Sequence, residues 1–428
     1  MLKVSAWAGS HKGRVRTNNE DSYLVNEEVG LFAVADGVGG GNAGEVASQL
    51  AVRSVDDFFV TARERLVQHR RDNEEIFRRR VLAELSGALR EASGKIFAKA
   101  AEDFSCYGMA TTMDLLLILE EGAFIGHVGD SRVYLVRADK VYQLTEDHSV
   151  GQRLVKSGRL KSEDLKTFPY RNVIERSLGP VPAVQPDTFW VNVEAGDLFV
   201  LCSDGLSDFV TPNDIRTLVQ SYRGKDLVVR LIRLANQRGG GDNITVVLVE
   251  PENVRPAMRN GPLDWTMRVE HLRGVFLFNQ MSDQELLRVL RCVYEEHRRP
   301  GAIIIREGEP GDRFHILVQG TAEVTVSGVL LQTMRAGQHF GELALVDNSP
   351  RSATVTALDA VHLLTIKRND LLELLESDAE IARKLLWAFL GNVTERLRSV
   401  SHQLADKSRP ISKAVDVDAT LPAVPRRS

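Results

Sequence analysis

Short apolar runs alternate with longer amphipathic segments over the first half of the chain. The run at 31–35 is continuously apolar and stops at Asp36-Gly37, which is typical of a buried strand that ends in a turn. Residues 45–60 place Val46, Leu50 and Phe58 at helical spacing, and 63–101 is a second, charge-rich helical region. Further strands are predicted at 112–120, 123–128, 131–136, 140–144, 197–202 and 244–249, and a helix at 226–237.

The periodicity stops between 251 and 263, where prolines and glycines mark a linker. Beyond it we predict helices at 269–278 and 283–294, strands over 301–366, and a broken helical region at 370–404. Ser282 is placed to cap the second of these helices. The polar end of the chain is typical of a disordered tail. The predicted division is a domain at 1–252, a linker at 253–264, a domain at 265–404 and a tail at 405–428.

Composition narrows the class of protein. A chain of 428 residues can bury two cores, and its 43% hydrophobic and 26% charged shares are those of a globular protein. The net charge of -4 gives no general case for nucleic acid as a partner. Three cysteines without metal or disulfide spacing fit a reducing cytoplasm. With no signal-like start and no apolar run of membrane length, we expect a cytoplasmic protein without a membrane partner.

A carboxylate and a guanidinium lie close together in the last third of the chain. Gly341, Glu342, Leu343 and Ala344 can form one helical turn, whose free N–H groups favour an anion. Arg351, a few residues on, is the side chain best suited to grip a phosphate. The pair suggests a sugar phosphate with a ribose hydroxyl on Glu342 and its phosphate on Arg351. The alternative is a surface turn with a salt bridge.

These residues closely resemble the phosphate-binding cassette of cyclic nucleotide-binding domains, over about 265–403. The resemblance implies a β jelly roll with flanking helices, and contacts from the 341–344 turn, Arg351 and Ser352 to cAMP or cGMP. Ser352 could meet the guanine amino group, but bacterial cAMP receptors also carry serine there, which favours cAMP. The helical stripe at 385–397 would be a lid over the ligand, and a homodimer through the C-terminal helices is the alternative.

Acidic residues recur where apolar strands end in the first domain. They are Asp36, Asp130, Asp204 and Asp242, joined by the early pair Glu20-Asp21. Any one of them could be a turn residue bonded to its own backbone. Gathered together they would repel unless a cation neutralised them, and an all-oxygen set favours Mg²⁺ or Mn²⁺. Two such ions can share a water, lower its pKa and direct it at phosphorus.

Arg16 precedes the acidic pair and could clamp a phosphoryl oxygen. The motifs closely resemble those of the PP2C family of metal-dependent serine/threonine phosphatases over about 2–250; they are RTNNED at 16–21, VADGVGG at 34–40, VGDSR at 128–132, SDGLSD at 203–208 and GDNITV at 241–246. The resemblance implies an α+β fold, a four-layer α-β-β-α sandwich. It also implies a mobile flap segment at 147–179 beside the site.

The resemblance also assigns roles by motif. Asp36 would bridge two metals and the Gly37 carbonyl would ligate one, while Asp204 and Asp242 would hold one metal. Asp21 and Glu20 would act through metal-bound waters, Asp130 with Asp208 would form a third metal site, and Arg16 would bind the substrate phosphate. Phosphorylated proteins are then the substrates.

One residue departs from the animal members of that family. Val38 stands where they carry a histidine proposed as general acid, so another group must protonate the leaving oxygen. His127 and His148 are candidates, although a structural role is the simpler interpretation of each. Three functions follow: a phosphatase regulated by a cyclic nucleotide, a phosphatase whose second domain is a nucleotide-free scaffold or dimerisation module, and a catalytically dead nucleotide sensor.

Overall fold

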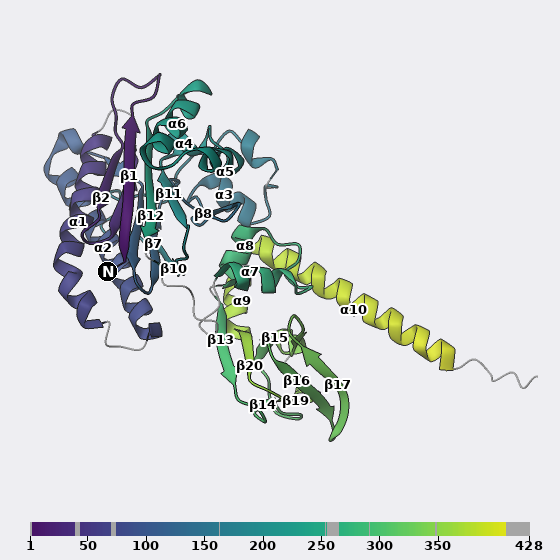
Figure 1. Cartoon of the computed structure of the whole chain (residues 1–428). Coiled ribbons are helices and arrows are strands. Elements are labelled where there is room, and N and C mark those ends of the chain that lie inside the picture. Colours follow the sequence, from purple (N-terminus) through teal and green to yellow (C-terminus); the bar gives the residue numbers. More distant parts are fainter. Residues whose placement is uncertain are drawn as a thin grey trace, which may run out of the picture.

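Two five-stranded antiparallel sheets face each other in the N-terminal domain, which comprises the described residues of 2–252 (Figure 1). The computed structural model describes residues 2–38, 43–69, 74–161, 163–252, 254, 265–290, 292–346 and 349–407. One sheet has the order β1 (Lys3–His11), β12 (Ile244–Glu252), β11 (Leu198–Cys202), β8 (Arg132–Arg137), β9 (Lys140–Gln143). The other has the order β10 (Asp187–Val191), β7 (Gly122–Val128), β6 (Met113–Leu119), β3 (Leu31–Ala35), β2 (Ser22–Asn26).

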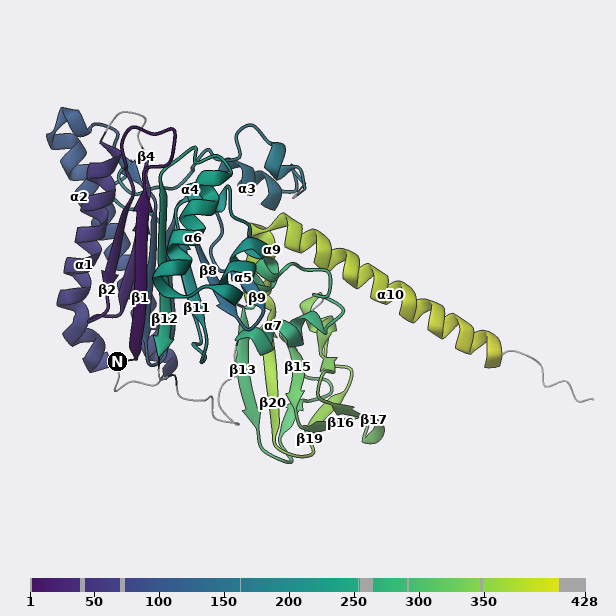
Figure 2. The same ribbon diagram turned by 45° about the horizontal axis from the view of Figure 1, so that its top comes forward.

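Helices cover the outer face of each sheet. α1 (Gly44–His69) and α2 (Glu74–Glu102) pack on the second sheet, and α5 (Pro212–Ser221) and α6 (Gly224–Gln237) pack on the first. Because both faces of β3, β6 and β7 are covered, every residue of these strands is buried, which explains why their sequences are apolar apart from the paired Asp114 and His127. The α-β-β-α sandwich predicted from the sequence is confirmed (Figure 2).

Smaller elements complete the N-terminal domain. The two-residue strands β4 (Gly37–Val38) and β5 (Ala110–Thr111) pair with each other. The remaining helical pieces are η1 (Phe104–Cys106), α3 (Val150–Lys156), η2 (Leu165–Thr167) and α4 (Asp204–Ser207). Of these, α3 and η2 belong to the flap segment, residues 147–179.

Two four-stranded sheets form the barrel of the C-terminal domain, the described residues of 265–407. One sheet has the order β13 (Val293–Arg298), β20 (Val361–Lys367), β15 (Arg313–Gln319), β18 (His339–Phe340). The other has the order β14 (Ile303–Ile305), β19 (Thr354–Ala357), β16 (Thr321–Val326), β17 (Val329–Arg335). The helices are α7 (Trp265–Arg273), α8 (Asp283–Leu290), η3 (Glu342–Leu345), α9 (Arg368–Ser377) and α10 (Ala379–Lys407). No described helix has the length and apolar content of a membrane span.

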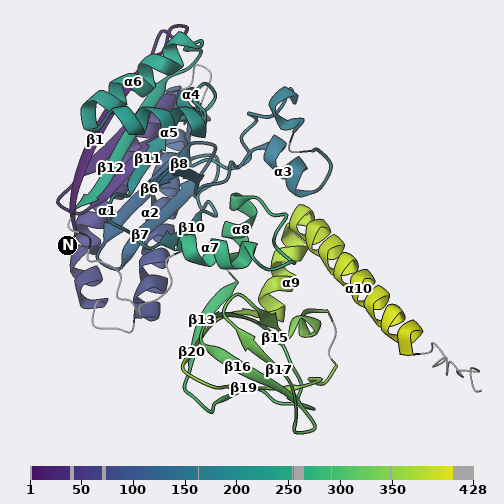
Figure 3. The same ribbon diagram turned by 45° about the vertical axis from the view of Figure 1, so that its right-hand side comes forward.

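The two domains share an apolar core through α7 and α8, which lie between the first domain and the barrel (Figure 3). Val269, Leu272 and Leu286 belong to the same buried cluster as residues between the two N-terminal sheets. The ring centroid of Trp190 in β10 lies 3.6 Å from Cζ of Arg78 in α2 and 5.9 Å from Cζ of Arg268 in α7. The domains are therefore joined by packing as well as by the chain itself.

Several element boundaries differ from the sequence prediction. The helix predicted at 283–294 ends at Leu290, and β13 begins at Val293 because its backbone pairs with β20. The helix predicted at 45–60 continues to His69. The strand β12 runs through Pro251, where only β1 is its partner, so the missing N–H breaks no ladder bond on the other side. α10 continues to Lys407; the predicted linker, apart from residue 254, and the tail beyond 407 lie outside the described residues.

Candidate functional site

The strand ends of the N-terminal domain bring its acidic residues to one edge of the sandwich. Asp36, Asp130 and Asp204 follow β3, β7 and β11 directly or within two residues, whereas Asp21 and Asp242 lie just before β2 and β12. Because neighbouring strands are antiparallel, the end of one strand lies beside the start of the next. We call Glu20, Asp21, Asp36, Asp130, Asp204 and Asp242 the acidic cluster.

Neighbouring hydroxyl and amide groups fix the acidic cluster. Thr112 Oγ1 accepts a hydrogen bond from Asp36 N at 3.0 Å, and the hydroxyl of Thr111 donates to Asp36 O at 2.8 Å. The hydroxyl of Ser203 donates to Asp21 Oδ2 at 2.8 Å. Gly37 is required for space, since a Cβ there would overlap the carbonyl oxygens of Gly44 and Glu20.

Asn243 organises the loop that carries Arg16 and Glu20. Its side chain accepts from Glu20 N at 2.8 Å and donates to Lys12 O and Asn18 O at 3.0 and 2.9 Å. Arg16 lies at the rim and pairs with Asp242 at 2.7 Å between Nη2 and Oδ2. Sequence reasoning quoted Asn243 within a motif but gave it no role; its position one residue after Asp242 was the available signal.

Burial and mutual repulsion disfavour the ionised form of several carboxylates in the acidic cluster. Burial raises the pKa of Asp36 well above its ordinary value, and the charges of Asp21, Asp204 and Asp130 raise it further. Burial likewise raises the pKa of Asp130 to about 7 and that of Asp21 to about 6. A cation among these groups would reverse the effect by favouring their ionised forms.

Three carboxylate oxygens of the acidic cluster fit such a cation. Oδ1 of Asp21, Asp130 and Asp204 are buried and accept no hydrogen bond in the described structure. Buried acceptors without a partner are rare, and an unpaired oxygen set suits Mg²⁺ or Mn²⁺. No group of three or more acidic, His or Cys side chains in the described part of the chain is arranged to hold a metal ion, so the ligand set implied by the family resemblance stays a prediction.

Asp208 lies apart from the buried members. It is exposed, and its Oδ2 accepts a hydrogen bond at 3.1 Å from Asn172 in the flap segment. Its charge still contributes to the raised pKa of Asp204 after burial and the charges of Asp130 and Asp242. The structure therefore brings Asp208 to the flap side of the acidic cluster.

Neither candidate histidine is open to a substrate. His127 is fully buried, with Nδ1 2.6 Å from Asp114 Oδ1 and Nε2 2.8 Å from Glu146 O. His148 accepts from Gly129 N at 3.1 Å through Nδ1, and its Nε2 lies 3.6 Å from Asp187 Oδ2. The geometry gives both rings a structural role.

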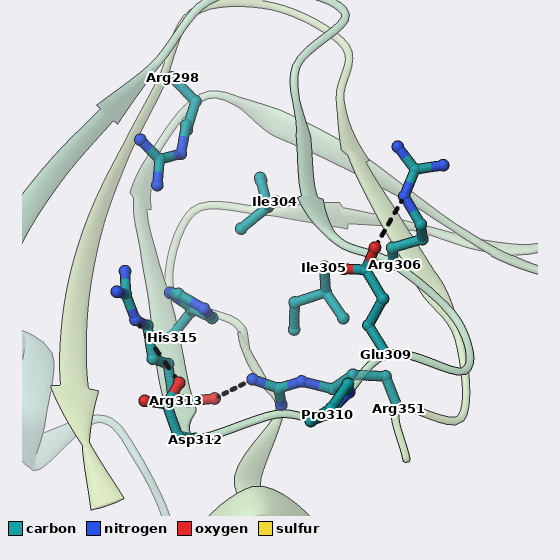
Figure 4. A pocket seen from close by; sticks show the side chains of 10 residues that line it. All are labelled: Arg298, Ile304, Ile305, Arg306, Glu309, Pro310, Asp312, Arg313, His315 and Arg351. Carbon is teal, nitrogen blue, oxygen red and sulfur yellow. Dashed lines mark hydrogen bonds and ion pairs between the residues drawn. The ribbon is translucent and has the colours of Figure 1, made fainter.

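A separate cavity of about 260 Å³ opens in the barrel of the C-terminal domain (Figure 4). Arg298, Arg313 and Arg351 line it together with His315. The guanidinium of Arg351 donates from Nη2 to Arg313 O at 2.8 Å. Burial and these three arginines lower the pKa of His315 to about 3, so the ring stays neutral. With Arg306, the arginines of the lining outnumber its two acids, Glu309 and Asp312, so the cavity is cationic on balance.

Only some of the residues predicted to bind the nucleotide lie at this cavity. Gly341 takes a left-handed conformation with φ 81° and precedes the η3 turn formed by Glu342 to Leu345. Arg351 Nη1 lies 3.4 Å from Gly341 O, which ties the turn to the cavity wall. Glu342, Leu343, Ala344 and Ser352 are not among the residues that line it. The cationic character contributed by Arg298 and Arg313 was not foreseen, because the two residues lie on different strands.

Comparison with known proteins matches both halves of the chain. The family model "Protein phosphatase 2C" matches residues 8–245, and "Cyclic nucleotide-binding domain" matches 295–378. Protein phosphatase PhpP of Streptococcus pneumoniae is 35% identical over 241 residues, covering 55% of this chain and 93% of its own. The crystal structure of the Mycobacterium tuberculosis serine/threonine phosphatase PstP/Ppp has a TM-score of 0.52 and 36% identity over 58% of this chain and 99% of that one.

A third similarity bears on cofactors. The catalytic domain of PstP in complex with two manganese ions has a TM-score of 0.50 and 34% identity, covering 58% of this chain and 99% of that one. The chain belongs to the protein phosphatase 2C family. It is a serine/threonine protein phosphatase that also carries a cyclic nucleotide-binding domain.

Proposed function

We propose that this phosphatase hydrolyses phosphoserine and phosphothreonine in proteins under the control of a cyclic nucleotide bound by its C-terminal domain. The observation that carries the proposal is Arg351, which stands in the wall of a cationic cavity and contacts the glycine that begins the predicted phosphate-binding turn. A second support is that α10, the last helix of that domain, contacts α3 of the flap segment. Ligand and substrate regions are therefore linked by packed elements.

The acidic cluster would hold two Mn²⁺ or Mg²⁺ ions through Asp36, the Gly37 carbonyl, Asp204 and Asp242, with Asp21 and Glu20 acting through water. A third ion would lie at Asp130 and Asp208. The bound ions would supply a water of lowered pKa and neutralise phosphoryl charge. Arg16, exposed at the rim, would bind the phosphoryl oxygens of the incoming substrate.

The C-terminal domain would bind the nucleotide phosphate through Arg351 and the N–H groups of the turn at Gly341 to Ala344, and the ribose through Glu342. We favour cAMP. Ser352, the residue that could meet a guanine amino group, is exposed and does not line the cavity. The preference for cAMP follows the resemblance, since bacterial cAMP receptors also carry serine at this position.

The test is dephosphorylation of a phosphothreonine peptide by the full chain with Mn²⁺, with and without cAMP or cGMP, beside calorimetric binding of each nucleotide. We expect metal-dependent turnover that changes about 5–150-fold with cAMP. Arg351→Ala should lose the response and keep the hydrolysis. Absence of hydrolysis with Mn²⁺ under any nucleotide would falsify the proposal, and equal responses of the two proteins would exclude the regulatory part.

A homodimer through α10 is favoured by one further observation. Leu386, Leu390, Val393 and Leu397 are each between 48% and 63% exposed and repeat at the spacing of a coiled-coil seam. We propose that a second copy covers this stripe. Sedimentation of the full chain and of Leu390→Glu tests this dimer, since only the native chain should dimerise. If the C-terminal domain is only a scaffold, the native chain still dimerises and cAMP does not change its activity.

A further inference from the structure

Arg288 of α8 connects three parts of the molecule. Its Nη1 donates to Glu146 Oε1 of the N-terminal domain at 2.6 Å, and each of these two side chains is 12% exposed. Its Nε lies 2.9 Å from Oδ2 of Asp378, the buried residue between α9 and α10; the two groups form an ion pair without hydrogen-bond geometry. One guanidinium therefore joins the C-terminal helices to the segment that leads into the flap.

Glu146 is in turn the residue that holds the flap helix α3. Gln152 donates to its Oε1 at 2.8 Å and Lys156 pairs with its Oε2 at 2.7 Å, and both belong to α3. Burial raises the pKa of Glu146, but Arg288 and Lys156 outweigh burial and leave it below its ordinary value. A charged carboxylate held by three donors has little freedom to move independently of them.

The backbone beside Glu146 reaches the acidic cluster. Glu146 O lies 2.8 Å from His127 Nε2, which fixes its place over β7. Two residues later, His148 N donates to Gly129 O at 2.7 Å, and Gly129 N donates to the His148 ring at 3.1 Å. Gly129 directly precedes Asp130, so displacement of Glu146 would be felt at one end of the acidic cluster.

The other end of this connection leads to the nucleotide cavity. Asp378 Oδ1 accepts from Ile381 N at 3.0 Å and so caps the start of α10. The preceding helix α9 packs against the η3 turn, and its first residue, Arg368, donates from N to Asp312 O in the cavity wall at 2.8 Å. A shift of α9 on ligand binding would move the carboxylate of Asp378, and with it Arg288, the guanidinium that also binds Glu146.

We propose that Arg288 is a positioning residue of the phosphatase: the C-terminal domain supplies it, and it sets the place of Glu146 and of the flap helix α3 where protein substrates enter. Because Arg288 pairs with Asp378, the position of Arg288 depends on the junction of α9 and α10. The link to the nucleotide rests on the function proposed above, whereas the effect of Arg288 on the flap does not. A peptide that must pass the flap should depend on Arg288 more than a small ester.

The experiment compares Arg288→Met, Arg288→Lys and the control Arg273→Met in the full chain with Mn²⁺. Arg273 also makes an ion pair, but with Asp283 inside its own domain. The substrates are a phosphothreonine peptide and p-nitrophenyl phosphate. We expect Arg288→Met to raise KM for the peptide about tenfold, with kcat and the small ester changed less than about twofold. Arg288→Lys should recover most of the loss, and Arg273→Met should behave as the native chain.

Glu146→Gln provides the second variant should Arg288→Met fold poorly. It should raise the peptide KM at least as much, and the double variant should be no worse than Glu146→Gln alone, because Arg288 acts on α3 through Glu146. Additive losses, an equal shift in Arg273→Met, no recovery with lysine, or an equal loss on both substrates would each overturn the positioning role.

The response to cyclic AMP tests the positioning role of Arg288 separately from the proposed regulation by the nucleotide. In the native chain it should shift the peptide KM, and in Arg288→Met it should bind with unchanged affinity by calorimetry yet shift nothing. A native chain that ignores cAMP, with the KM effect of Arg288→Met intact, contradicts the proposed regulation and supports the positioning role. A cAMP response that persists in Arg288→Met overturns the transmission through Arg288.

Discussion

Gly311 leaves the space that the guanidinium of Arg351 occupies in the cavity of the C-terminal domain. A Cβ at Gly311 would overlap Nε, Cζ and Cδ of Arg351. Gly311→Ala should therefore push Arg351 away from the phosphate position and weaken cAMP binding by at least about tenfold, the cost of one lost charge-assisted contact. Calorimetry on the full chain measures the dissociation constant.

A matched glycine substitution controls for general effects of the added methyl group. Gly391 lies within α10, and a Cβ there meets no atom within 4 Å. Gly391→Ala should leave cAMP affinity unchanged and stabilise the helix by about 0.5–1 kcal/mol. If Gly311→Ala binds cAMP as well as Gly391→Ala does, Arg351 does not hold the phosphate.

The sequence was sufficient to predict the families of both domains, because local motifs specify them. Gly341 and Arg351 lie within one short stretch, and Asp36, Asp130, Asp204 and Asp242 each follow or precede an apolar run that the structure confirms as a strand. The strands β1 and β2 were missed, since their residues are only partly buried and mix apolar with polar types. Contacts between distant segments, such as Arg288 with Glu146 or Arg298 with the cavity, leave no local pattern to detect.

The helix predicted at 283–294 shows why boundaries are harder. Residues 291–294 continue a helical pattern, yet Val293 and Tyr294 pair with Ile366 and Thr365 of β20. A partner 70 residues or more away in sequence decides the conformation, and local propensity is overridden.

Neutralising one carboxylate of the acidic cluster should raise the stability of the metal-free chain and lower its activity with metal. Asp204 has a buried oxygen without a partner, and burial followed by the charges of Asp130 and Asp242 raises its pKa well above the ordinary value. Asp204→Asn should raise the melting temperature of the EDTA-treated chain by about 2–5 °C. Hydrolysis of the phosphothreonine peptide with Mn²⁺ should fall by at least about a hundredfold.

Metal titration sharpens this prediction. Mn²⁺ at 100 times its dissociation constant should stabilise the native chain by about 2.7 kcal/mol, and Asp204→Asn by clearly less. Asp57→Asn, an exposed acid on α1, serves as the control and should match the native chain in both measurements. An Asp204→Asn protein that is less stable than the native chain without metal would contradict the repulsion within the acidic cluster.

The neutral state of His315 should appear in the pH dependence of stability. Burial, together with Arg351, Arg313 and Arg298, lowers its pKa to about 3 in the folded chain, whereas an unfolded histidine has a pKa of about 6.5. Below pH 6.5 the unfolded state therefore binds a proton that the folded state refuses, and stability falls by about 1.4 kcal/mol per pH unit.

Urea unfolding of the native chain and of His315→Gln at pH 7.5 and 5.5 measures how much His315 contributes to the pH dependence of the unfolding free energy. The loss of unfolding free energy between the two pH values should be about 1.4 kcal/mol smaller in the variant. His11→Gln, at the exposed end of β1, should retain the native loss. Parallel pH profiles for the native chain and His315→Gln would mean that the folded cavity accepts the proton.

Asn243 should be necessary for activity although it touches no substrate. Its buried side chain bonds the backbone of three residues, Lys12, Asn18 and Glu20, that lead through the loop bearing Arg16. Asn243→Ala leaves these backbone groups unpaired, so we expect a loss of about 2–4 kcal/mol in unfolding free energy. The loosened loop should also raise KM for the phosphothreonine peptide, because Arg16 is no longer held at the rim of the acidic cluster. Asn213→Ala, on the exposed start of α5 where the Asn213 side chain accepts a hydrogen bond from Arg216, should change neither quantity. Steady-state kinetics and urea unfolding compare the two variants. If Asn243→Ala loses stability but keeps its KM, the loop is held by other contacts and Arg16 is positioned independently of Asn243.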